Sequence, residues 1–434
     1  MKPRKSSTRL WFVFNQQHLC WKLSVIVLLA TVLVSTSTRA QQPPVPLPTD
    51  RELIVELLKK VQSLETRVQE LEGVLAKCTG CARAVEAAPV ATAARVPEAP
   101  REEDHMGMAR PGPNLQIRGF ADVNFHGSSQ RGSTTSFSLG QLNLFVTSEV
   151  SEKFKFLSEI VFEAGDDNVP GVDVERLLLQ YSHNDYFNLA VGRYHTAIGY
   201  YNTAYHHSTW FQTAIGRPFL FEFEDDGGIL PIHNVGVSVS GRIPSGGLGL
   251  HYIIELGNGR ASRSPLDEAV QNVLDENNRK SYNLALFARP EALPGLQAGF
   301  SVYRDLLAPD GLPRIGQTIL AAHAVYIKPN FEWLNEALLI RHAPHGQMRV
   351  FHTPGFYSQV SRRFGSYRPY VRYEYVNAGV EEPVFPDVGL RHGPSMGLRF
   401  DAGDSIALKL QYDRTMLRGR PSFNGLALQF AFTF

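Results

Sequence analysis

Charged side chains recur at alternate positions of several segments, and this spacing points to ion or polar-solute handling rather than covalent chemistry. In residues 154–163, Lys155, Glu159 and Glu163 share one face of an extended chain, while phenylalanines occupy the other. Rings of fixed charge around a water-filled passage set which ions it admits. Each such charge could equally be a solvated wall residue. The candidate lining residues, from strand faces and from the long connector 196–233, are Arg118, Lys155, Glu159, Arg176, Arg217, Glu222, Glu224, Asp225, Asp226, Arg368, Arg372, Glu374, Arg399 and Lys409.

The residues give little support to catalysis or metal binding. Residues 236–241 read Gly-Val-Ser-Val-Ser-Gly, a near miss to the G-x-S-x-G elbow that lacks its second glycine and lies in a strand pattern. His206 and His207 have no second cluster spaced to complete a zinc site. The acidic runs 166–168 and 224–226 leave Ca²⁺ as a minor alternative. We therefore expect no enzyme activity, no cofactor and no metal.

The composition narrows the class of protein. The chain has 434 residues and a formal net charge of +1, so no global field recruits nucleic acid. Three cysteines are too few for a disulfide framework. The mean hydropathy of -0.16 excludes a helical membrane protein. It does not exclude a β-barrel, because half of each membrane strand faces water.

The segment 424–434 predicts the element that organises the remainder. Its large apolar residues fall at every second position and small or polar residues lie between them, which is the period of a strand. An open sheet edge rich in phenylalanine invites aggregation, whereas the last strand of a closed barrel pairs with the first. The pattern resembles the C-terminal strand of bacterial outer-membrane proteins, in which the final Phe, here Phe434, is part of the signal for the assembly machinery.

From residue 115 onward, alternating segments of about ten residues are split by turn residues. The connectors 151–152, 183–186, 244–246, 291–294, 329–330, 365–366 and 401–404 are short. Those between them are longer: 126–136, 164–173, 196–233, 258–280, 305–314, 343–348, 377–389 and 415–422. Short periplasmic turns and long outer loops are typical of membrane barrels. The prediction is an all-β chain with an antiparallel transmembrane β-barrel of about 16 strands over residues 115–434.

The first 40 residues predict an export signal. Basic residues precede an apolar run at 23–34, which is shorter than the roughly 20 residues of a spanning helix. Thr38-Arg39-Ala40 then fits a small-x-small cleavage site. An uncleaved anchor is the alternative. Residues 41–50 form a proline-rich spacer.

Residues 51–78 predict a short coiled coil, which export places in the periplasm. Thr49 and Glu52 form a capping box, and apolar residues then recur at heptad a and d positions from Ile54 to Leu75. A trimer is favoured over a dimer, and a lone amphipathic helix is a further alternative. Cys78 and Cys81 are expected to form a disulfide, within one chain or between chains. Residues 79–114 are rich in Ala, Pro, Glu and Arg and predict a flexible linker.

Several stretches together resemble the phosphate-selective porin superfamily: 137–163, 174–181 running to 192–194, 217–218, 234–237, 258–259 and 369–374. The resemblance implies a trimeric sixteen-stranded channel in the outer membrane, whose third outer loop folds inward and narrows the pore. It would place the connector 196–233 in that role. Phosphate as a substrate is not expected, because predicted inward acids are nearly as many as inward bases.

The main hypothesis is therefore a passive diffusion channel for small polar or ionic solutes. The partners it implies are outer-membrane lipids, the solute itself, further copies of the chain and the assembly machinery, with no nucleic acid. The alternative hypothesis is a structural protein whose coiled coil tethers the outer membrane to the cell envelope. A barrel enzyme is a third and weaker alternative.

Overall fold

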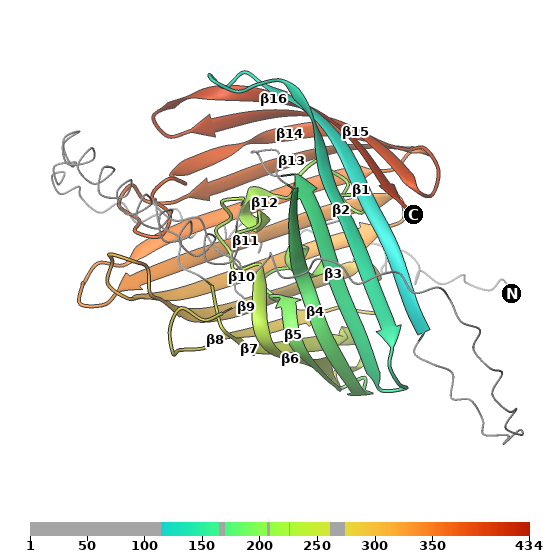
Figure 1. Ribbon diagram of the computed structural model, residues 1–434, viewed down its shortest axis with the longest axis vertical. Helices are drawn as coiled ribbons and strands as arrows, with labels where there is room; N and C mark the ends of the chain where they lie inside the picture. The colour runs from blue at the N-terminus through green and yellow to red at the C-terminus, as the bar shows by residue number, and fades with distance from the viewer. Residues whose placement is uncertain (1–113, 165–169, 206–208, 225, 261–273) are drawn as a thin grey trace, which may run out of the picture. The chain divides into compact units, whose positions relative to one another are not determined.

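The computed structural model describes residues 114–434 except 165–169, 206–208, 225 and 261–273 (Figure 1). Residues 1–113 lie outside the described residues. They include the predicted signal peptide, proline-rich spacer, coiled coil and Cys78–Cys81 disulfide, and residues 79–113 of the linker. These remain predictions. Among the described residues, no helix combines the length and the apolar character needed to cross a membrane.

Sixteen antiparallel strands form one closed barrel, which confirms the predicted fold and strand number. Each strand pairs with its neighbours in sequence, and β1 pairs with β16 to close the sheet (Figure 1). The strands are β1 (Asn114–Ser128), β2 (Ser136–Glu149), β3 (Phe154–Ala164), β4 (Pro170–Asn184), β5 (Phe187–His195), β6 (His233–Ile243), β7 (Leu250–Gly257), β8 (Ser281–Ala288), β9 (Leu296–Leu307), β10 (Ile315–Lys328), β11 (Phe331–Pro344), β12 (Phe351–Arg362), β13 (Tyr367–Asn377), β14 (Leu390–Asp401), β15 (Ile406–Leu417) and β16 (Arg420–Thr433).

The last strand closes the barrel as its period of two predicts. Phe430 pairs with Val123 and Phe432 with Ala121. The backbone N–H of Gly119 donates to the carbonyl of Phe434 at 2.9 Å, and the N–H of Phe434 donates back at 3.0 Å. Residues 119–128 of β1 are therefore paired along this seam, and the exposed phenylalanines of β16 lie on the outer wall rather than on an open edge.

Alternation separates the two faces of the wall. On β15 and β16, Leu410 and Phe430 are 46% and 48% exposed, whereas Lys409 and Gln429 are 2% and 4% exposed. An outer surface of this kind is stable in a lipid environment and unfavourable in water. The exposed large apolar residues on other strands include Ile117, Leu139, Val174, Leu179, Ile254, Leu284, Phe300, Leu320, Trp333, Val371 and Met396.

The connectors are short at one end of the barrel and mostly longer at the other. The end with short connectors, here called the short-turn end, includes the β10–β11 turn at residues 329–330 and the β6–β7 link with 3₁₀ helix η2 (Gly246–Leu248). One predicted long connector, 415–422, is wrong. Strands β15 and β16 extend until only Arg418 and Gly419 join them, and Gly419 has a φ of 64° that suits a tight turn.

The connector between β5 and β6, residues 196–232, is here called the inward connector. It carries helix α3 (Tyr201–Ala204) and 3₁₀ helix η1 (Phe219–Phe221) and lies against the inner wall (Figure 1). Its apolar residues form one core with the inward faces of β9–β13 and with part of the connector 378–389. The fully buried members include Ile198, Leu220, Phe221, Ile229, Tyr303, Ile319, Leu334, Ile340, Tyr357 and Phe385. This part of the barrel interior is therefore packed with side chains.

Candidate functional site

Buried carboxylates on the barrel wall hold the first part of the inward connector. Glu336 on β11 accepts hydrogen bonds from the backbone N–H groups of Tyr200 and Tyr201 at 2.5 and 2.9 Å. Glu255 on β7 accepts one from the N–H of Ala197 at 3.0 Å. Glu332 accepts from the Tyr205 hydroxyl at 3.2 Å. These inward acids are therefore anchors for the connector rather than charges facing open water.

Basic residues predicted to line the lumen hold the next part of the connector. On β14, Arg399 Nη1 donates to the carbonyls of Trp210 and Gln212 at 2.6 and 2.9 Å. On β15, Lys409 Nζ donates to the carbonyl of Thr209 at 2.6 Å.

Basic residues of β13 hold the inward connector in the same way. Arg372 Nη1 donates to the carbonyl of Gly216 at 3.0 Å, and Arg368 Nη1 donates to the Thr213 hydroxyl at 3.4 Å. Arg368, Arg399 and Lys409 lie directly opposite one another across the strands. Like charges in such positions repel one another. The connector carbonyls and the Asp401 carboxylate, which is 2.7 Å from Arg399, offset this repulsion.

Gln411 also holds the inward connector to the wall. It is not among the residues predicted from the sequence. Its side-chain oxygen accepts from the N–H of Ile215 at 2.9 Å, and its side-chain nitrogen donates to the Ile215 carbonyl at 3.0 Å. The inward parity of residues 407, 409 and 411 on β15 was the available signal. An uncharged amide at such a position is not marked out by charge, although it can both donate and accept.

Two of the predicted connector residues are buried. Arg217 lies over the Phe223 ring at 4.2 Å and donates to the Asn202 side chain at 3.4 Å. Burial lowers the pKa of Arg217. Burial also opposes the ionisation of Glu224, but the charge of His233 and the hydrogen bonds that it donates lower the pKa of Glu224 overall. Both side chains therefore stabilise the connector from within.

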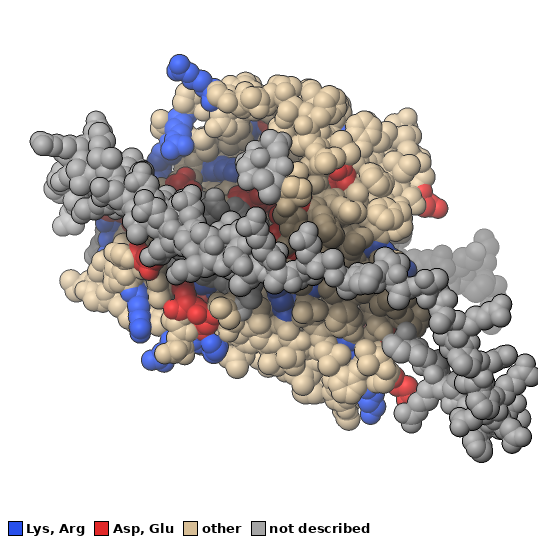
Figure 2. All heavy atoms as spheres, in the orientation of Figure 1, with Lys and Arg blue, Asp and Glu red and all other residues tan. Residues whose placement is uncertain are grey.

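A polar passage remains between the inward connector and the strands β1, β2 and β13–β16. Two neighbouring cavities of about 300 and 320 Å³ share lining residues including His126, Gly216 and Glu222. Acidic and basic side chains are visible inside the hollow of the barrel in Figure 2, while the uncovered outer wall is largely free of charge. The passage is thus bounded by the connector on one side and by polar wall residues on the other.

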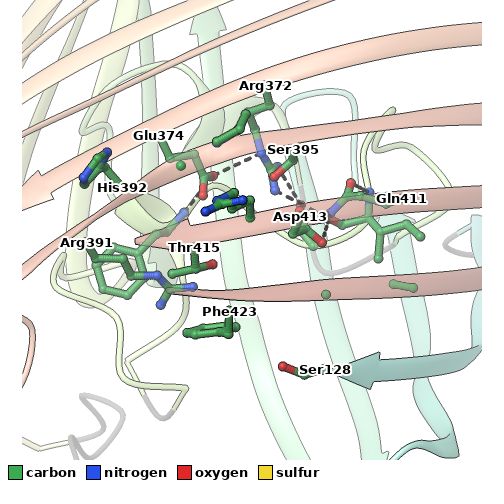
Figure 3. A pocket seen from close by; sticks show the side chains of 18 of the residues that line it. Ser128, Arg372, Glu374, Arg391, His392, Ser395, Gln411, Asp413, Thr415 and Phe423 are labelled. Atoms are coloured by element: carbon green, nitrogen blue, oxygen red, sulfur yellow. Dashed lines mark hydrogen bonds and ion pairs between the residues drawn. The ribbon is translucent and has the colours of Figure 1, made fainter. Parts of the chain in front are cut away.

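Several lining charges form no direct ion pair with another described residue. Asp122 accepts hydrogen bonds from Asn124 at 2.7 Å and from the N–H of Gln141 at 3.1 Å, and Asp413 accepts one from Gln411 at 3.0 Å. Arg391 lies over the Phe219 ring at 4.3 Å. Figure 3 shows Arg391, Asp413 and the Arg372–Glu374 pair around one cavity. Charges of both signs that lack a direct ion pair therefore face the passage.

Glu222 stands at the junction of the two cavities. Burial raises the pKa of Glu222 to about 7, and the negative charge of Asp226 adds to the effect. The positive charge of Arg391 acts in the opposite direction. Glu222 therefore changes its charge close to neutral pH.

Some of the remaining predicted residues lie apart from this passage, and others line it or form ion pairs. Arg118 is exposed on β1, and Lys155 is exposed and 3.4 Å from Glu149. Arg176 and Glu159 form an ion pair on β3 and β4. Glu374 is paired with Arg372 at 3.1 Å, and Asp226 lines the second cavity. Asp225 lies outside the described residues. The alternation of the strands therefore predicts which residues lie on the inward face, but not which groups each of them contacts.

Arg193 shows how the backbone changes parity. Simple alternation would place Arg193 on the lipid face, so the sequence predicts a bulge or a rim position there. Arg193 is 8% exposed and lies 3.5 Å from the buried Glu175. Gly192 has a φ of 135°, and a Cβ there would lie 2.0 Å from the Leu177 carbonyl oxygen. Only glycine fits this irregularity, which allows Arg193 to point inward.

Metal chemistry has no evident place in the part of the chain that the structure describes, since no group of three or more His, Cys, Asp or Glu side chains is arranged to hold an ion there.

No protein family model matches the sequence, and no curated protein is significantly similar to it. Solved structures, however, match the barrel. An anion-selective porin from Comamonas acidovorans matches with a TM-score of 0.53 and 13% identity, over 74% of this chain and 100% of that one. The chain has the fold of an outer-membrane porin. The outer membrane channel DcaP of Acinetobacter baumannii matches with a TM-score of 0.52 and 12% identity, over 75% and 99% of the two chains.

A trimer form of OmpT, an outer membrane protein of Vibrio cholerae, matches with a TM-score of 0.51 and 10% identity, over 74% of this chain and 100% of that one. At these identities the similarity establishes the porin fold and not the solute.

Proposed function

We propose that this chain is an outer-membrane porin, a passive diffusion channel for small polar or ionic solutes, in which the inward connector narrows the passage. The observation that carries the proposal is the connector's attachment to the inner wall through buried acids and bases. That attachment leaves a polar passage along β1, β2 and β13–β16. A lumen with charges of both signs suits hydrated solutes, and a lipid-facing apolar wall suits a membrane.

Reconstitution of the purified barrel into planar bilayers tests the proposal. The expected result is stepwise conductance that is ohmic at low voltage. The same protein denatured by heat is the control. A barrel that is folded by circular dichroism and by heat-modifiable electrophoretic mobility, yet is silent in the bilayer, would contradict the channel and favour a structural role.

The oligomer, the location and the assembly route are further parts of the proposal. A trimer is supported by the similarity to a structure described as a trimer form and by the resemblance to phosphate-selective porins. We also propose an outer-membrane location with the coiled coil in the periplasm, and recognition of the last strand by the assembly machinery. Native mass spectrometry in detergent distinguishes one, two and three copies. Deletion of Phe434 should lower the amount of barrel in the outer membrane.

A further inference from the structure

A second recess lies within the barrel, beneath residues 197–204 of the inward connector. Its volume is about 280 Å³, and it shares no lining residue with the two cavities of the passage. The inward faces of β7–β10 form its wall. A further cavity of about 410 Å³ shares Tyr200, Arg289 and Gln297 with this recess and continues along residues 290–296. The recess therefore has a route to the short-turn end.

Hydrogen bonds fix the donor pattern of this recess. Arg289 Nε donates to the side-chain oxygen of Gln297 at 2.8 Å, so the Gln297 amide nitrogen must face the other way. That nitrogen lies 3.2 Å from His323 Nε2 and donates to it. A neutral imidazole that accepts at Nε2 carries its proton at Nδ1. His323 therefore presents an Nδ1–H donor.

The donors of the recess outnumber its acceptors. His323 is 8% exposed and Ser301 is 3% exposed. The buried His323 Nδ1 and Ser301 Oγ atoms have no hydrogen-bond partner among the described residues. Arg289 lies over the Phe287 ring at 5.0 Å and forms no ion pair within the described part of the chain. No carboxylate side chain lines the recess, and Arg289 is its one charged lining residue. A buried donor without an acceptor is costly, so such a site favours an anion.

We propose that this recess binds a small monocarboxylate with an apolar body. Arg289 supplies the charge for the carboxylate, and Ser301 and His323 supply neutral donors. Alanine, isoleucine and phenylalanine side chains of the wall contact the remainder of the molecule. This binding goes beyond the proposed channel, since it requires no conduction. A recess of this volume lies at the small end of ligand sites, which limits the ligand to about the size of benzoate.

Titration of the full-length protein in detergent with benzoate tests this site, using isothermal calorimetry and empty micelles as the blank. Saturable binding is expected for benzoate and not for benzylamine. Arg289→Met should weaken it by about tenfold or more, because a charge-assisted contact is lost. Ser301→Ala should weaken it severalfold. Arg279→Met is the matched control, because Arg279 is exposed in the β7–β8 connector at the opposite end of the barrel, and it should bind as the unaltered protein does.

Each outcome decides the proposal. Loss of binding in Arg289→Met with an unchanged circular dichroism spectrum supports the site. Absence of saturable binding to the unaltered protein, or equal binding by Arg289→Met, overturns it, and the unpartnered donors then hold water only. Bilayer conductance without benzoate binding would leave the proposed channel in place and reject the recess. Binding without conductance would do the reverse.

Discussion

The two sides of the barrel interior are built from the same kind of strand, but one is packed with apolar side chains and the other is lined by polar ones. Inward residues of β9–β12 include Tyr303, Ile319, Leu334 and Tyr357, which pack against the apolar side of the inward connector. Inward residues of β1 and β13–β16 are largely polar and face either the connector backbone or the passage. The comparison teaches that a strand's period shows which residues point inward, while their chemistry shows whether protein or water stands opposite.

The largest expected effect on conductance comes from releasing the inward connector from the packed side of the barrel, at Glu336. Glu336→Ala should free residues 199–201, because the backbone donors of Tyr200 and Tyr201 and the hydroxyl of Tyr357 lose their acceptor. Buried donors without a partner cost about 1–3 kcal/mol each. Single-channel conductance should rise at least twofold with more open-channel noise. Glu291→Ala, at an exposed turn residue, is the control and should leave conductance unaltered.

A smaller effect is expected on the polar side of the connector. Lys409→Met removes hydrogen bonds to the Thr209 carbonyl and to the Gln429 side chain, and a charged hydrogen bond contributes about 1.5–3 kcal/mol. The substitution also relieves repulsion between Lys409 and Arg399. The net loss of stabilising free energy should therefore be nearer the lower end of this range.

Current recordings of this variant should show additional subconductance levels with a mean conductance close to that of the unaltered protein. Lys328→Met, at the short-turn end of β10, is the matched control. A mean conductance that doubles would indicate that this lysine alone holds the connector in place.

Ion preference should respond to the lining carboxylates. Asp122 forms no direct ion pair with a described residue and lines the second cavity. Asp122→Asn should therefore shift the reversal potential in a KCl gradient toward the anion value by several millivolts, an order of magnitude set by removing one fixed charge. Asp310→Asn, in an exposed turn, should produce no shift. Identical reversal potentials for both variants would place Asp122 outside the path of the ions.

The smallest predicted effect depends on pH. The pKa of Glu222 is raised to about 7 by burial, so its carboxyl group is neutral well below that pH and negative above it. The passage gains a negative charge as pH rises through 7, and cation preference should increase between pH 5.5 and pH 8.5. Asp226, Glu374, Arg391 and Arg217 also face Glu222 and set the size of the change. Glu222→Gln should flatten this dependence, measured as reversal potential against pH.

Much of the fold could be predicted from the sequence because alternation and closure are local signals. The apolar alternation of 426–434 identified the closing strand, and the charge alternation of 154–163 identified an inward face. The path of the inward connector could not be predicted in this way. Its contacts join residues far apart in the chain, such as Lys409 and Thr209, which are 200 positions apart. Arg193 departs from simple alternation, as the sequence predicts, but the backbone of Gly192 that allows this depends on contact with β4, which the sequence does not show.

The junction of β1 and β16 has a consequence for the order of folding. The Thr433 hydroxyl donates to the carbonyl of Gly119 at 3.0 Å, a contact between residues 314 positions apart. Bringing such distant partners together costs more chain entropy than any hairpin of the sheet, so it follows the neighbouring pairings. Until then both end strands expose bare backbone in or beside the bilayer. The ring of Phe434 packs over Gly119, where a Cβ would lie 2.3 Å from the ring and would oblige it to move. Together with the two backbone hydrogen bonds between Gly119 and Phe434, this contact favours the register in which the barrel closes.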